Sequence, residues 1–149
     1  MNYLIDTSVL VRALHAVDPA SAVARQALSA LFRRQDSLYI LPQIVAEFWV
    51  VATRPETDNG LGHTPAQTDR WLMRFRASFN LQYETAAVYQ QWRGLLSDYQ
   101  IKGKQAHDAR LAAAAQTHRF DAILTFNGKH FQRYAGLTVV HPADIADRE

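Results

Sequence analysis

Short apolar segments that are typical of buried strands alternate along this chain with longer segments that have the periodicity of amphipathic helices. The first pair is a strand from Asn2 to Ile5 and a helix from Thr7 or Ser8, either of which is a candidate cap, to about His15. Helices of ten or more residues between strands indicate βαβ units with parallel strands. The sequence therefore predicts an α/β fold, a three-layer α/β/α sandwich around a central, mainly parallel sheet. Further strands are expected at residues 38–41, 81–83, 122–125 and 137–140.

Prolines and polar caps mark the starts of the other helices. Asp18-Pro19 predicts a helix through about Arg34, and Pro42 predicts one through about Thr53. A loop follows from residue 54 to 62, because this stretch contains proline, asparagine and two glycines. The remaining helices are expected to start at Thr64-Pro65, at Thr85 and at about Gln105, and the last of them to end near His118.

Length and composition limit the possible classes of protein. A chain of 149 residues can bury about 68–70% of the surface its unfolded form exposes, and we expect one domain over residues 1–149. The absence of cysteine excludes disulfides, thiolate metal sites and cysteine nucleophiles. No apolar run approaches the roughly 20 residues of a membrane span, and no signal-type segment opens the chain, so we expect a soluble cytoplasmic protein. The net charge of +2 is too small to indicate nucleic-acid binding by itself.

Three isolated carboxylates stand in otherwise apolar stretches. Asp6 ends the first strand, Glu47 is the only charged residue between Asp36 and Arg54, and Asp108 opens an alanine-rich helix. Each would cost several kcal/mol to bury without a cationic partner. For any one of them a structural ion pair is the commoner explanation. Three such acids favour a divalent metal site.

Their expected positions agree with a shared site. In open α/β sheets ligands bind at the carboxyl ends of the strands, where Asp6 and the segment after Thr125 are expected. Asp108 lies in the first turn of its helix, where the helix dipole favours a carboxylate, and Glu47 shares a helix face with Ile44 and Val51. Carboxylates without histidine or cysteine are the ligands that Mg²⁺ or Mn²⁺ prefers.

Four segments together resemble the PIN-domain ribonucleases, and among these the VapC toxins of bacterial toxin–antitoxin pairs. They are Leu4-Ile5-Asp6-Thr7-Ser8, the segment from Pro42 to Phe48, the segment from His107 to Ala113, and the segment from Leu124 to Phe131. None of these is specific alone, but their order and spacing together are, and the resemblance spans the whole chain.

The resemblance implies catalytic and metal-binding roles for Asp6, Glu47 and Asp108 with one or two Mg²⁺ or Mn²⁺ ions. The family often has a fourth acid where this chain has Asn127, whose carbonyl oxygen offers a weaker ligand for a second metal. The implied activity is metal-dependent hydrolysis of RNA phosphodiester bonds. A small antitoxin protein and a homodimer are implied as partners, with an exposed apolar groove near Phe48 and Trp49 as the expected antitoxin surface.

Other polar residues have ordinary structural explanations. Thr7 and Ser8 are expected first to cap the following helix, with a hydrogen bond to a metal ligand as a further role. Candidate phosphate contacts, each also explicable as a solvated charge, are Arg12, Arg54, Lys102, Lys104, Lys129 and Arg133. The six histidines lack the spacing of a zinc site and are expected at the surface or in caps. The Trp71, Phe75 and Trp92 side chains are expected in the core.

Several other functions fit the sequence less well. A haloacid dehalogenase phosphatase needs a second Asp where Ser8 stands, and a P-loop or dinucleotide site needs glycines that residues 6–17 lack. A phosphate-receiver domain needs paired acids that the N-terminus lacks. The alternative that remains open is a PIN-like module that binds RNA or a partner protein and cleaves poorly.

Overall fold

The computed structural model, which describes residues 1–146, contains a five-stranded sheet in which every neighbouring pair of strands is parallel. The strands are β1 (Asn2–Ile5), β2 (Ser37–Ile40), β3 (Asn80–Leu81), β4 (Ala122–Leu124) and β5 (Val139–Val140). Their order across the sheet is β3-β2-β1-β4-β5. β1 is the central strand, and its Leu4 is paired with Tyr39 on one side and with Ile123 on the other.

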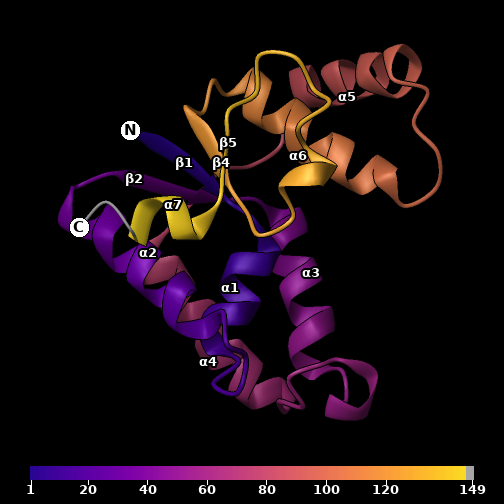
Figure 1. The fold of residues 1–149 in the computed structure, drawn as a ribbon. Helices are drawn as coiled ribbons and strands as arrows, with labels where there is room; N and C mark the ends of the chain where they lie inside the picture. Colours follow the sequence, from indigo (N-terminus) through magenta and orange to yellow (C-terminus); the bar gives the residue numbers. More distant parts are fainter. Residues whose placement is uncertain (147–149) are drawn as a thin grey trace.

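Helices cover both faces of this sheet. They are α1 (Thr7–Leu14), α2 (Ser21–Arg33), α3 (Pro42–Thr53), α4 (Pro65–Ser78), α5 (Ala86–Asp98), α6 (Gln105–Thr117) and α7 (Pro142–Ala146), with short 3-10 helices η1 (Glu56–Asp58) and η2 (Gly128–His130). Figure 1 shows α5 and α6 together on one side of the sheet and α1, α2 and α7 on the other. The predicted three-layer α/β/α fold with a parallel sheet is therefore confirmed.

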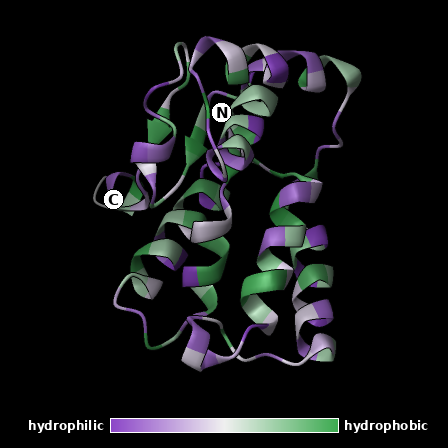
Figure 2. Ribbon diagram, turned by 90° about the vertical axis from the view of Figure 1, so that its right-hand side faces the viewer, coloured by the Kyte–Doolittle hydropathy of each residue, from purple (hydrophilic) through white to green (hydrophobic). Residues whose placement is uncertain are grey.

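The core lies between the sheet and these helix layers. Leu4, Ile5, Ile123 and Leu124 are fully buried, as a strand covered on both faces requires. Figure 2 shows the strands coloured mainly as hydrophobic, while hydrophobic and hydrophilic positions alternate along the helices. Ala112, Ala113 and their alanine neighbours on α6 are buried as well, so small side chains allow this helix to pack closely. No helix within residues 1–146 is long and apolar enough to cross a membrane.

Most elements follow the sequence signals, and four differ from them. The predicted α2 start at Asp18-Pro19 is wrong, because the Asp18 carboxylate accepts the Ala20 N–H at 2.8 Å and forms a turn that delays the helix to Ser21. The third strand is Asn80–Leu81 rather than residues 81–83, and the fifth is Val139–Val140 rather than residues 137–140. Helix α7 was not predicted. At α4 the expected start is confirmed, with a capping box between Thr64 and Gln67.

Candidate active site

The strand order reverses between β1 and β4, since β2 and β3 extend the sheet on one side and β4 and β5 on the other. Such a switch point leaves a crevice at the carboxyl ends of the two strands, where ligands bind in open α/β sheets. Asp6 follows β1 and Thr125 follows β4, and the Asp6 N–H still donates to the Leu124 carbonyl at 3.0 Å. The structure therefore places both residues at this crevice.

Asp6 is held by hydroxyl groups. Its side chain is buried, and its Oδ2 accepts hydrogen bonds from Ser8 Oγ at 2.6 Å and from Thr125 Oγ1 at 2.7 Å. The prediction that Thr7 or Ser8 caps α1 is wrong, because Asp6 is the N-cap residue and no side chain makes a capping bond there. The expected hydrogen bond from a hydroxyl to an acid of the site is present instead. Two hydroxyl donors thus fix the orientation of this carboxylate.

Glu47 lies in the middle of α3 and faces the same crevice. Its Oε2 accepts from Thr7 Oγ1 at 2.7 Å, and its Oε1 accepts from Gln43 Nε2 at 2.8 Å. Thr7 and Ser8 therefore each serve a different acid, since the first two residues of α1 point toward α3 and β4 respectively.

Asp108 lies in the first turn of α6, and its side chain is 30% exposed. Partial burial is the main cause that raises its pKa, and the negative charges of Asp6 and Glu47 raise it further. The nearby His130 and His107 lower this pKa in part, and His130 Nδ1 lies 3.2 Å from Asp108 Oδ2. Asp108 thus lies near enough to Asp6 and Glu47 for their charges to raise its pKa.

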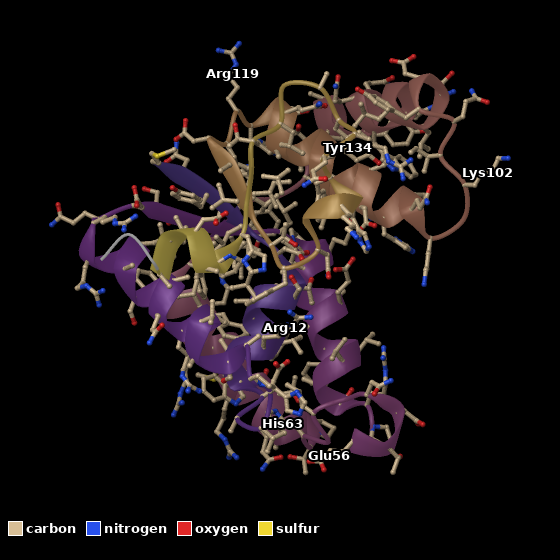
Figure 3. The ribbon with its side chains drawn as sticks, viewed as in Figure 1. Arg12, Glu56, His63, Lys102, Arg119 and Tyr134 are labelled. Atoms are coloured by element: carbon tan, nitrogen blue, oxygen red, sulfur yellow. The ribbon has the colours of Figure 1, made fainter. Side chains whose placement is uncertain are left out.

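A cleft of about 590 Å³ contains these acids, with Asp6, Glu47, Asp108 and Asn127 all in its lining. Basic side chains form part of the same lining, namely Arg12, Lys104, Lys129 and Arg133. In Figure 3, Arg12 from α1 and Tyr134 from the segment after η2 lie on either side of this region, and both line the cleft. Of the six predicted phosphate contacts, Arg54 and Lys102 do not line the cleft.

The donors of this cleft fit a hard divalent cation in chemistry, although they do not converge on one point. Within residues 1–146 no group of three or more histidine, aspartate or glutamate side chains is arranged to hold a metal ion. The reason lies in the contacts above: each acid turns toward its own hydroxyl, amide or imidazole partner. Carboxylates are the ligands of Mg²⁺ and Mn²⁺, and a cation would relieve the repulsion felt by Asp108.

Some residues of the site were not identified from the sequence. His130 lies at the surface, as expected, but its contact with Asp108, 22 residues away in the chain, was not foreseen. His141 caps a helix, as expected, since its Nδ1 accepts the Ala143 N–H. The only sequence feature that could have identified Gln43 is its position one helical turn before Glu47. Asp121 lies at the opposite edge of the sheet, as expected, where its Oδ2 accepts the Asn2 N–H at 2.7 Å.

The aromatic residues also differ in part from expectation. Phe75 is buried, and Trp71 and Trp92 pack partly buried against the core, as predicted. The Phe48 side chain does not contribute to the apolar groove predicted near Phe48 and Trp49, because it is fully buried and packs edge-on against Phe75. An apolar groove of about 630 Å³ lies elsewhere, between α2 and α4, and its lining includes Leu14, Leu28, Phe32, Phe75 and Phe79.

Comparison with known proteins gives one family and several similar structures. The model of the PIN domain family matches residues 3–137. VapBC2 from Rickettsia felis, bound to a DNA fragment from its promoter, is 19% identical over 95% of this chain and 98% of that chain, with a TM-score of 0.69. VapC20 from Mycobacterium tuberculosis, a sarcin-ricin loop cleaving toxin, is 15% identical over 91% and 96% of the two chains, with a TM-score of 0.67.

VapBC-1 from nontypeable Haemophilus influenzae is similar to the same degree, at 17% identity over 95% of this chain and 98% of that chain, with a TM-score of 0.69. At such identities these likenesses show the fold. Comparison of the sequence with curated proteins gives no significant match.

Proposed function

Since the chain belongs to the PIN domain family, we propose that it is a metal-dependent endoribonuclease that hydrolyses RNA phosphodiester bonds. The observation that carries this proposal is the meeting of three carboxylates from three different elements in one cleft with a basic rim. The acidic centre suits a divalent cation, and the basic rim suits the phosphates of a nucleic acid.

The proposed ligands of the metal are Asp6 and Asp108, with Glu47 binding the ion or orienting the attacking water and Asn127 offering a carbonyl oxygen. A Mg²⁺ or Mn²⁺ ion bound there lowers the pKa of water and offsets negative charge on the phosphate. Ser8 and Thr125 orient the Asp6 carboxylate, and Thr7 orients that of Glu47, through their hydroxyl groups. Water supplies the new oxygen on phosphorus, so the chain needs no nucleophile of its own.

The basic residues of the rim are proposed to bind the RNA backbone. Lys104 precedes α6 and Lys129 lies in η2, so they reach the cleft from elements next to Asp108 and Asn127. Arg12 Cζ lies 4.4 Å from the centre of the Phe126 ring, and Arg12 Nε lies 3.8 Å from Asp18 Oδ2. These contacts hold the Arg12 guanidinium at the cleft. Arg12, Lys104 and Lys129 thus line the same cleft as the three acids.

We place the protein, on the same grounds, as the toxin of a toxin–antitoxin pair that acts in the cytoplasm. Three similar structures support the toxin role: two are of VapBC, the third is of a sarcin-ricin loop cleaving toxin, and all three cover nearly the whole chain. The expected partners are a small antitoxin and a second copy of the chain. Growth should slow when the wild-type chain is expressed alone, and should not slow with Asp108→Asn.

The direct test is cleavage of total RNA, tRNA included, by purified protein with Mg²⁺ or Mn²⁺. Discrete products are expected that disappear with EDTA and with Asp108→Asn. The matched control is Asp121→Asn, the same change at the opposite edge of the sheet, which should cleave normally. Cleavage that survives both EDTA and Asp108→Asn would contradict the assignment.

One specific pair of observations favours a second candidate function, a PIN-like module that binds RNA or a protein and cleaves poorly. Asn127 stands where the family often has an acid, and the acids do not converge on one point within the described residues. A folded protein that binds Mn²⁺ and RNA without cleaving would establish this alternative.

A further inference from the structure

Gln43 connects two elements of the site that otherwise pack against different neighbours. It lies in the first turn of α3, next to Pro42 and one turn before Glu47. Its Nε2 donates to Glu47 Oε1 at 2.8 Å and also to the backbone carbonyl of His107, on α6, at 3.0 Å. Asp108 is the next residue along α6. A single side-chain amide therefore joins the helix of one acid to the helix of another.

The orientation of this amide is determined by its partners. A carboxylate and a backbone carbonyl can only accept hydrogen bonds, so the NH₂ end of Gln43 must face both of them. The Gln43 Oε1 is then buried without a hydrogen-bond partner. Buried polar atoms are usually paired, so an arrangement that leaves one unpaired points to a requirement for the two donated bonds.

The link matters because packing does little to join α3 to α6. α6 packs mainly on α5, and α3 packs on α1 and α4. In Figure 1, α5 and α6 lie in the upper part of the view, and α1, α3 and α4 lie in the lower part. The separation between the Glu47 and Asp108 carboxylates depends on how α3 is held to α6. The Gln43 amide makes this connection through its hydrogen bond to the His107 carbonyl.

We propose that Gln43 is a positioning residue that sets the spacing of Glu47 and Asp108 and thereby the affinity of the cleft for its divalent cation. The inference rests on the proposed function, because it presupposes that these acids bind a metal. Outer-shell hydrogen bonds to metal ligands are commonly worth a factor of 10–100 in affinity, and loss of Gln43 should fall in that range.

The test replaces Gln43 with methionine, which has nearly the same length and no donor. Mn²⁺ binding is measured by calorimetry on protein without RNA, so the readout does not depend on cleavage. The Kd for Mn²⁺ is expected to rise about 10- to 100-fold. The matched control is Gln91→Met, since Gln91 Nε2 donates to Gln116 Oε1 at 2.7 Å and thus joins α5 to α6 away from the acids. Its Kd should stay within about twofold of the wild type.

A double-mutant cycle separates positioning from a general structural effect. In a Glu47→Ala background, adding Gln43→Met should weaken Mn²⁺ binding much less than it does in the wild type. An equal loss in both backgrounds would overturn the proposal, and so would unchanged Mn²⁺ binding by Gln43→Met. A wild-type protein that binds no Mn²⁺ would refute the proposed function as well, so the two failures are distinguishable.

Thermal unfolding shows whether each variant is folded. If Gln43→Met does not fold, the side-chain amide signals of Gln43 are followed by NMR in the wild type as Mg²⁺ is added. They should shift in parallel with metal binding, because Glu47 Oε1 is their acceptor. Amide signals that do not respond to saturating Mg²⁺ would overturn the proposal.

Discussion

Replacing Thr125 with valine tests whether the hydroxyl network around Asp6 holds the site together. Thr125 is fully buried, its Oγ1 donates to Asp6 Oδ2 at 2.7 Å, and the same oxygen accepts the Asn127 N–H at 2.9 Å. Valine has the same shape, with a methyl group in place of the hydroxyl. The change therefore removes these two hydrogen bonds, together with a longer contact of 3.4 Å to Ser8 Oγ, and leaves the packing volume almost unaltered.

The expected cost follows from the two bonds. A hydrogen bond to a charged group contributes about 1.5–3 kcal/mol, while the exposed Asn127 can give its N–H to water at little cost. Thr125→Val should thus lower the free energy of unfolding by about 1.5–3 kcal/mol. Thr125→Ser keeps the hydroxyl and loses one buried methyl group, which should cost only about 1 kcal/mol.

The assay is urea unfolding at pH 7 with EDTA present, followed by circular dichroism, so that metal binding does not enter the comparison. For a chain of this length, Thr125→Val should also lower the Tm by about 4–10 °C. The reasoning would be refuted by a valine variant as stable as the wild type, or by a serine variant less stable than the valine one.

Two further predictions concern charge and backbone. The pKa of Asp108 is raised above its ordinary value of 3.8 by burial and then by the charges of Asp6 and Glu47. The folded state therefore binds the Asp108 proton more tightly than the unfolded state does, and the free energy of unfolding falls as the pH rises above about 3.8. In EDTA, Asp108→Asn should therefore be more stable than the wild type at pH 7, with a smaller difference at pH 4; equal differences in urea unfolding at both pH values would contradict this. Gly60→Ala should cost about 1–3 kcal/mol of unfolding free energy, because an added Cβ would collide with the Arg54 carbonyl. Its control, Gly94→Ala in the open middle of α5, should gain about 0.5–1 kcal/mol, and a loss at Gly94 as large as that at Gly60 would argue against backbone collision.

Local sequence signals were sufficient for the layers of the fold. The apolar run before Asp6 and the segment from Ala122 to Leu124 form strands, and Pro42 starts α3, because strand burial, helix periodicity and proline are read within a few residues of chain. Local signals were insufficient at Asp18, because an aspartate that caps a turn and one that caps a helix are followed by the same residue types. They were also insufficient at α7, because a helix of five residues is too short to show a periodicity.

The sequence by itself determined which acids the chain carries and that Asp6 ends a buried strand. The tertiary structure decided what each acid contacts. Thr125 reaches Asp6 from 119 residues away, Thr7 reaches Glu47 from 40, and Gln43 reaches His107 from 64. Such partners follow from the strand order, which brings β1 beside β4, and from helix packing across the sheet. Neither the strand order nor the helix packing is encoded in a local pattern. A hydroxyl next to an acid in the sequence is equally compatible with a helix cap and with a hydrogen bond to a metal-binding carboxylate.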